Sequence, residues 1–182
     1  MGAALTAAAL ELGHDVVVIS GPVTVDYPAA ADVIPVVTTD EMLQAACEAF
    51  AKCDGAIGAA APCDYMPHTV QSQKISKTGQ PLTIELIETA DVVATLGKNK
   101  RDDQWVVGFA LETEDQRFRA IVKLERKHCD LMVSNGPSAI DASNNDVELL
   151  DPDGKVLAHI QGSKSHVADQ LLTEIDRRLI QA

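Results

Sequence analysis

The stretch "MGAALTAAALELGHDVVVIS", residues 1–20, joins a helix pattern to a strand pattern. Residues 3–15 are rich in Ala and Leu and end at Gly13, a residue type that commonly terminates helices. Residues 16–20, "VVVIS", form a β-branched run that is typical of a strand covered on both faces. A helix that leads directly into a buried strand favours an α/β fold with a parallel sheet.

The rest of the chain repeats this alternation. Further strands are predicted at 33–39, 55–61, 81–88, 105–112 and 129–135, and further helices at 38–53, 89–99, 114–128 and 164–180. Thr39 or Asp40 is the expected N-cap of the helix over 38–53. Residues 146–160 predict a β-hairpin with an Asp-Pro-Asp-Gly turn, which could serve as a sheet edge or a dimer contact. We expect one domain over residues 1–182: a three-layer, Rossmann-like α/β fold whose mainly parallel sheet has a C-terminal antiparallel hairpin.

Composition narrows the class of protein. With 46% apolar and only 3% aromatic residues, the core must be aliphatic. A net charge of −12 argues against binding to nucleic acid or to an anionic membrane. The four cysteines show no CxxC pair or metal-ligand spacing, and no apolar run approaches the length of a membrane span. We therefore expect a cytoplasmic protein with reduced thiols.

The chain begins inside a helix. Folds of this kind normally begin with a strand and a glycine-rich turn that leads into that helix. We therefore expect the first β-strand and its phosphate loop to be absent from the sequence.

Candidate site residues gather where residues 55–64, "GAIGAAAPCD", leave a strand. Small residues at the carboxyl end of a parallel strand let a ligand approach the backbone, so Gly58, Ala59 and Ala60 could lie against a planar base or sugar. Asp64 could then hold a hydroxyl, an amino group or Mg²⁺. Alternatively, the same small residues serve close packing of a helix on the sheet. Residues 89–93, "TADVV", begin a helix whose N–H groups could hold a base edge or an anion.

Lysines supply the candidate positive charge. Lys74 and Lys77 lie in a polar loop and could act as lid lysines that neutralise a triphosphate, or be solvated surface residues. Lys123 and Lys127 are four residues apart and share one helix face, which either meets phosphates or faces solvent. Asn135 ends a strand and either enters the pocket or begins a turn. These residues support a nucleotide-binding α/β domain with an enzymatic function.

Taken in order, the segments resemble the phosphopantothenate–cysteine ligase family of coenzyme A biosynthesis. "MGAALTAAALELGHDVVVISGPV" is similar to that family's opening, "GAAAPCDYMP" to its AAVADYRP segment, "KISK" to its KIKK and "TADVV" to its PDIV. "VVGFALET", "KLERKHCDLMVSN" and the closing hairpin and helix follow in family order, so the resemblance covers essentially the whole chain.

The resemblance implies a two-step ligation. A nucleoside triphosphate, CTP in the bacterial type, activates the carboxylate of 4′-phosphopantothenate with Mg²⁺, and cysteine then attacks the acyl-cytidylate to give phosphopantothenoylcysteine and CMP. It further implies a homodimer, a catalytic lid lysine at Lys74 and Mg²⁺ binding by Asp64. The nucleotide contacts that it implies are Gly58, Ala59, Ala60, Asp64, Ala90, Asp91, Val92, Val93, Phe109, Lys123 and Lys127.

The chain departs from the family pattern in places. The family's Asn-x-Ser-Ser-Gly-Lys run, whose Asn is assigned to the acyl-nucleotidylate and cysteine-transfer steps, does not occur before Met1-Gly2. "PCD" replaces VAD and places Pro62 beside the site. Two alternatives therefore stay open: a non-catalytic nucleotide-binding module, and a nicotinamide-dependent Rossmann oxidoreductase, although no GxGxxG turn is present.

Overall fold

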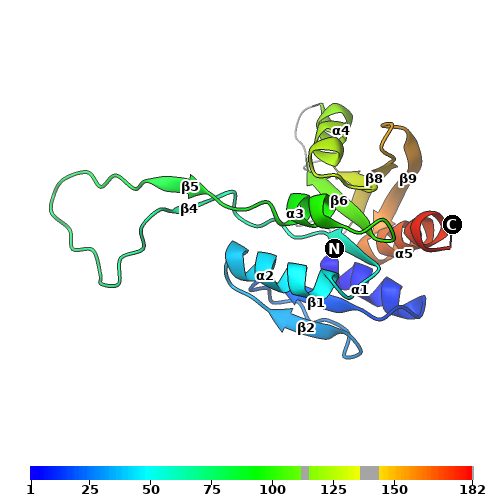
Figure 1. Ribbon diagram of the computed structural model, residues 1–182, viewed down its shortest axis with the longest axis horizontal. Coiled ribbons are helices and arrows are strands. Elements are labelled where there is room, and N and C mark those ends of the chain that lie inside the picture. The colour runs from blue at the N-terminus through cyan, green and yellow to red at the C-terminus, as the bar shows by residue number, and fades with distance from the viewer. Residues whose placement is uncertain (112–114, 136–143, 182) are drawn as a thin grey trace.

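The computed structural model describes residues 1–111, 115–135 and 144–181 of the chain (Figure 1). Its helices are α1 (Gly2–Glu11), α2 (Thr39–Phe50), α3 (Val92–Asn99), α4 (Gln116–Arg126) and α5 (Lys164–Ile175), followed by a π-helical turn at Asp176–Ile180. Its strands are β1 (Val17–Ser20), β2 (Asp32–Pro35), β3 (Gly55–Gly58), β4 (Tyr65–Pro67), β5 (Leu86–Glu88), β6 (Trp105–Leu111), β7 (Leu131–Asn135), β8 (Asn144–Leu150) and β9 (Val156–Ser163). The ends of the predicted strand 105–112 and helix 114–128 that reach residues 112 and 114 lie outside the described residues.

The main sheet has five strands in the order β3-β6-β7-β8-β9. β3, β6 and β7 are parallel, and the β8–β9 hairpin adds to β7 in antiparallel fashion. This confirms the predicted mainly parallel sheet with a C-terminal antiparallel hairpin.

The strands β1 and β2 form a separate parallel pair. The prediction that residues 16–20 form a strand covered on both faces is wrong, because Val17 is 40% exposed and β1 pairs with β2 alone among the described strands. A strand with only one neighbour and thin cover keeps part of its apolar surface in water.

Helices cover both faces of the main sheet, which confirms the three-layer arrangement. Successive residues of β6 point to opposite faces, so that Val106 and Val107 belong to different clusters of buried side chains. One cluster joins the sheet to α1 and α5, and the other joins it to α2, α3 and α4. The core is aliphatic as expected, and each fully buried Val or Leu contributes about 1.5–3 kcal/mol to stability.

The start of α2 corrects a prediction. The N-cap is Thr38, not Thr39 or Asp40: Thr38 Oγ1 accepts a hydrogen bond from the Glu41 amide at 3.1 Å. The Glu41 carboxylate in turn accepts from the Thr38 amide at 3.0 Å. This reciprocal capping box requires a glutamate three residues after the cap, and only Thr38 meets that spacing.

A hairpin, residues 65–88, projects from the body and is called the arm (Figure 1). Its base is the antiparallel pair β4–β5, and the ladder continues through a hydrogen bond from the His68 amide to the Glu85 carbonyl at 3.0 Å. The predicted strand over 81–88 is therefore assigned only at Leu86–Glu88. A two-stranded hairpin without a covering layer is marginal by itself, which limits the regular part to its base.

No helix within the described ranges has both the length and the apolar character needed to cross a membrane.

Candidate functional site

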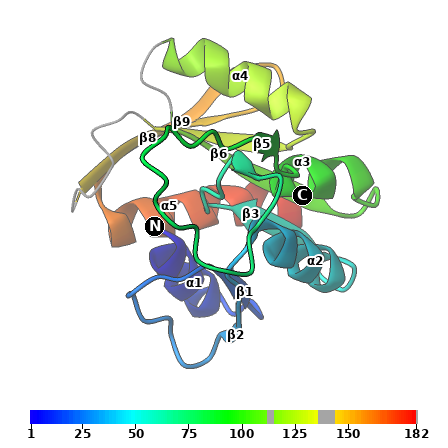
Figure 2. The same ribbon diagram turned by 90° about the vertical axis from the view of Figure 1, so that its left-hand side faces the viewer.

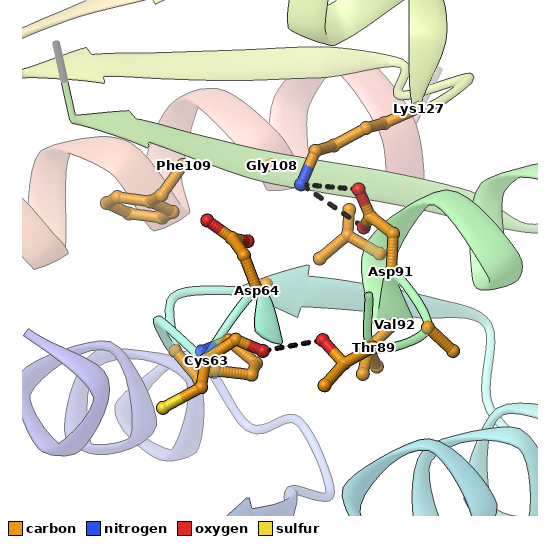
Figure 3. A pocket seen from close by; sticks show the side chains of 13 residues that line it. Cys63, Asp64, Thr89, Asp91, Val92, Gly108, Phe109 and Lys127 are labelled. Atoms are coloured by element: carbon orange, nitrogen blue, oxygen red, sulfur yellow. Dashed lines mark hydrogen bonds and ion pairs between the residues drawn. The ribbon is translucent and has the colours of Figure 1, made fainter. Parts of the chain in front are cut away.

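The pocket forms where β3 ends and α3 begins (Figure 3). A Cβ atom at Gly58 would lie 2.4 Å from a methyl group of Val93, so only glycine lets the start of α3 approach β3 this closely. Thr89 fixes the two chain segments that leave the pocket: its amide donates to the Asp64 carbonyl at 2.9 Å and its hydroxyl to the Cys63 carbonyl at 2.5 Å. The floor of the pocket is thus backbone and small side chains, held by direct hydrogen bonds.

An ion pair between Asp91 and Lys127 forms one wall. Asp91 is the N-cap of α3, and its Oδ1 accepts from the Ala94 amide at 3.0 Å. Lys127 Nζ lies 3.2 Å from the same oxygen and 3.1 Å from Oδ2. Burial by itself would raise the pKa of Asp91, but the hydrogen bonds from Ala94 and Lys127 outweigh it and hold that pKa below its usual value. Asp91 is therefore ionised and already engaged.

Gly97 brings the two partners of this ion pair together. A Cβ atom at Gly97 would lie 2.1 Å from the Lys127 carbonyl oxygen and 3.0 Å from that of His128. The middle of α3 therefore packs directly against the backbone that ends α4. This contact places Lys127 beside Asp91.

Asp64 differs from Asp91. Its carboxylate points into the space between Phe109 and the Asp91–Lys127 pair (Figure 3), and no described residue forms an ion pair or side-chain hydrogen bond with it. Since an ionised carboxylate accepts several hydrogen bonds or binds a cation, Asp64 is the group in the pocket that is available to a ligand.

Most of the predicted nucleotide contacts line this one pocket, although they come from distant parts of the chain. These are Gly58, Ala60, Asp64, Ala90, Asp91, Val92, Val93, Phe109 and Lys127.

Other predicted residues, Lys77 among them, do not line it. Ala59 packs instead against the core layer on the α1 and α5 side. Lys123 is half-buried one helical turn before Lys127 and lies outside the pocket lining. Lys74 is exposed on the part of the arm that extends away from the body, so the structure does not bring it to the pocket (Figure 1).

The structure adds residues that the sequence did not point to. Cys63, Thr89 and Gly108 also line the pocket. In the sequence, only their position next to predicted site residues pointed to them. Asn135, predicted to enter a pocket or begin a turn, ends β7 with a buried Oδ1 atom that has no hydrogen-bond partner among the described residues. The predicted turn would involve residues 136–138, which lie outside the described part. Asn145 is 5% exposed, and its Oδ1 atom likewise has no hydrogen-bond partner within the described ranges. Asn135 lies opposite Val147 in the β7–β8 ladder, and Asn145 comes two residues before Val147 on β8. Because residues two apart on a strand share a face, the side-chain amides of Asn135 and Asn145 lie on one face of the sheet.

A pocket at the carboxyl end of a parallel strand, beside a helix N-terminus, is the place where α/β proteins of this kind bind their ligands, and this pocket also holds the carboxylate of Asp64. Residues 1–179 match the family described as DNA/pantothenate metabolism flavoprotein C-terminal domain, and the chain belongs to that family. The resemblance inferred from the sequence is thereby confirmed.

Individual relatives agree with the family. The chain is 38% identical over 180 residues to the coenzyme A biosynthesis bifunctional protein CoaBC of Bacillus subtilis, covering 96% of this chain and 44% of the relative. It is also 38% identical over 181 residues to a protein named cysteine/cysteine sulfinic acid decarboxylase from an unknown prokaryotic organism, covering 96% and 50% respectively. The chain thus spans half or less of the length of these two relatives.

Solved structures show the same fold. The crystal structure of the C-terminal domain of a CoaBC protein superimposes with a TM-score of 0.82 at 30% identity, covering the whole of this chain and 83% of that one.

Proposed function

We propose that this protein is a ligase of coenzyme A biosynthesis that joins 4′-phosphopantothenate to cysteine in a CTP-dependent reaction. The observation that carries the proposal is the pocket between the end of β3 and the start of α3, in a chain of this family. It holds a free carboxylate at Asp64 and an ion-paired helix start at Asp91 on a floor without bulky side chains.

The chemistry consists of two displacements. A carboxylate oxygen of 4′-phosphopantothenate attacks the α-phosphorus of CTP, which forms the acyl-cytidylate and releases pyrophosphate. The cysteine amine then attacks the acyl carbon, an amide bond forms, CMP leaves with the electron pair of the broken C–O bond, and the amine loses a proton. Neither step needs a covalent enzyme intermediate, so the protein contributes by positioning and by electrostatics.

The pocket suits these tasks. Gly58 and Ala60 leave room for a base or sugar against the backbone, and Phe109 supplies an aromatic face beside them. Lys127 is committed to Asp91, so we assign it to holding the start of α3 in place and not to direct phosphate binding. Lys123 lies one turn earlier on the same face of α4.

The residues fit a magnesium ion of the kind that accompanies nucleotides. Among the described residues no three or more His, Cys, Asp or Glu side chains converge on one point, so a dedicated protein cage is not formed there. Mg²⁺ bound to a triphosphate commonly takes only one or two protein carboxylates, and Asp64 offers one. When bound, the ion would neutralise phosphate charge; Asp64 would hold it and would orient the triphosphate over the pocket floor.

Lys74 keeps its proposed role as the lysine that stabilises the activation step, with a condition set by the structure. It reaches a pocket only if the arm closes or if the arm of another molecule approaches. The position of Lys74 is also the observation that favours the second candidate function, a nucleotide-binding module that does not catalyse. Membership in the ligase family, in contrast, disfavours the nicotinamide-dependent oxidoreductase.

The test is mass spectrometry of a reaction that contains the protein, CTP, Mg²⁺ and 4′-phosphopantothenate, with and without cysteine. We expect phosphopantothenoylcysteine and CMP only when cysteine is present. Asp64→Asn should slow product formation by about 100-fold, because it removes the free charge at the site. Asp54→Asn is the matched control: it makes the same change at an exposed position at the other end of β3 and should leave the rate unchanged.

Calorimetric titration with CTP separates the candidates. Binding without product supports the module. Neither binding nor product, in protein shown to be folded by circular dichroism, would refute both nucleotide-based functions.

A further inference from the structure

A second cavity lies between α2 and α3, apart from the pocket. In both ribbon views these helices lie next to each other, and their buried side chains belong to the same core cluster (Figures 1 and 2). The cavity has a volume of about 400 Å³, which falls within the range of about 300–1,000 Å³ typical of small-molecule sites. It shares no lining residue with the pocket, although α3 contributes to both: Val92 and Val93 line the pocket, and Leu96 and Asn99 line the cavity.

The floor of the cavity is apolar. It is made by the buried side chains of Phe50 at the end of α2 and Leu96 in the middle of α3. Cys47 and Ala51 are exposed and lie at its mouth. A molecule with an apolar body would therefore remove apolar surface from water when it binds here.

The cavity is preformed, because a buried side chain ties its walls together. The Gln104 side-chain nitrogen Nε2 donates to the Phe50 carbonyl at 2.6 Å and to the Cys53 carbonyl at 2.7 Å. Its Oε1 accepts from the Arg101 amide at 3.0 Å. Both N–H groups of the Gln104 amide are thus used to hold the end of α2 against the start of β6. A ligand that enters the cavity has little ordering to induce, which favours binding.

The charge at the mouth indicates the kind of ligand. Arg101 Nη1 donates to the Ala51 carbonyl at 3.1 Å, and Arg101 Nε donates to the Asp103 carboxylate at 3.0 Å. A guanidinium has five N–H donors, so the other three have no partner among the described residues. The Asp103 side chain is 73% exposed, and water therefore screens its charge. None of the residues that line the cavity is acidic, and Asn99 adds a neutral amide.

We propose that the cavity between α2 and α3 is a second ligand site, which binds a small carboxylate with an apolar body, such as an arylacetate. The apolar body lies on Phe50 and Leu96, and the carboxylate accepts hydrogen bonds from the Arg101 guanidinium at the mouth. The proposal does not rest on ligase activity, since it follows from the shape, the apolar floor and the charge of a cavity that includes no pocket residue.

Naphthylacetate is the probe for this site, because it joins an apolar bicyclic ring to a carboxylate. For a compound of its size we expect a Kd of about 1 mM in a calorimetric titration. Naphthylacetamide is the matched control ligand, with the same shape and no charge. It should bind about 10-fold more weakly, because it cannot form a charge-assisted pair with a guanidinium.

Two exposed thiols locate the bound probe. Cys47 lines the cavity and Cys63 lines the pocket. At about ten times its Kd, naphthylacetate should slow the alkylation of Cys47 by iodoacetamide by about 10-fold and leave the alkylation of Cys63 unchanged. Peptide mass spectrometry measures both rates in one sample. This result is independent of whether CTP binds.

Variants separate recognition of the carboxylate from the shape of the cavity. Arg101→Gln should weaken binding of naphthylacetate by about 10-fold and leave binding of naphthylacetamide unchanged, a difference that a purely structural role of Arg101 would not produce. Lys98→Gln is the matched control: it removes a positive charge from an exposed residue outside the cavity lining. Ala51→Phe fills the mouth from an exposed position and should abolish binding of both compounds.

Three results would overturn the proposal. The first is an alkylation rate of Cys47 that naphthylacetate does not change at about ten times the expected Kd. The second is equal affinity for the carboxylate and the amide, which would make the cavity a site for neutral apolar molecules. The third is protection of Cys63 alone, which would place the probe in the pocket.

Discussion

Replacing Gly97 with alanine is expected to destabilise the protein and to disturb its pocket. In an ordinary helix Gly→Ala stabilises by about 1 kcal/mol, because glycine has the larger conformational entropy when unfolded. At Gly97 the new Cβ atom would lie 2.1 Å from the Lys127 carbonyl oxygen and 3.0 Å from the His128 carbonyl oxygen. Both contacts are with backbone, which cannot rotate away as a side chain does.

The magnitude follows from the separation that α3 and α4 need. An ordinary contact requires about 3.4 Å, so the helix must move by more than 1 Å. Overpacking of this kind costs about 1–3 kcal/mol of stability. The upper end of this range exceeds the gain in helix propensity. We expect a net loss of up to about 2 kcal/mol, or a Tm lower by up to about 8 °C for a chain of this size.

The control is Gly2→Ala. Gly2 opens α1, and the nearest atom to its added Cβ would be the Tyr27 hydroxyl oxygen at 4.0 Å, so the methyl group fits. Its Tm should be equal to or above that of the wild type. Thermal unfolding followed by circular dichroism measures the change in Tm, and calorimetric titration with CTP measures the disturbance of the pocket. A Gly97→Ala protein that is as stable as Gly2→Ala and binds CTP equally well would refute the close packing of α3 on α4.

Two further predictions concern ionisable groups. Asp91→Asn keeps the helix cap but removes the ion pair with Lys127. The pKa of Asp91 in the folded protein is held below its usual value. The stabilisation by this ion pair is therefore present above about pH 4 and is lost as the pH falls through the folded-state pKa. The variant should therefore lose at most about 1 kcal/mol at pH 7, because Asp91 is 36% exposed, and the two Tm values should converge by about pH 2; a constant difference across this range would contradict the ion pair. Burial raises the pKa of the Cys129 thiol to about 11, so iodoacetamide at pH 8 should label exposed Cys47 and Cys63 but not Cys129. CTP should protect Cys63, which lines the pocket, and leave Cys47 reactive, as peptide mass spectrometry will show; equal protection of both would place the nucleotide elsewhere.

The sequence predicted the layers well because they depend on local patterns. The alternation of Val106 and Val107 between two core clusters, and the β8–β9 hairpin with its Asp-Pro-Asp-Gly turn, follow from periodicity and turn chemistry that nearby residues determine. The pocket residues near Gly58 and Asp91 were singled out from the strand end and the helix start, but composition left a packing role open, and the resemblance then assigned them to a nucleotide site.

Other features depend on contacts that no local pattern encodes. The pairing of Lys127 with Asp91 requires α3 to lie against the end of α4. Gly97 makes this possible because it has no side chain between α3 and the backbone that ends α4. The exposure of Val17 depends on which strands lie beside β1, whereas its β-branched run by itself predicts a buried strand. The position of Lys74 depends on where the arm points, and the polar residues around it specify no contact with the body.

The hydrogen bond from the Thr89 amide to the Asp64 carbonyl has a consequence for regulation. It lies next to the Tyr65–Glu88 pair that begins the β4–β5 ladder, so the residue whose carboxylate lies in the pocket also joins the arm to the body. A ligand that fixes Asp64 and a partner that fixes the arm would restrict the same short piece of backbone. By thermodynamic linkage each would then change the binding of the other by the same factor.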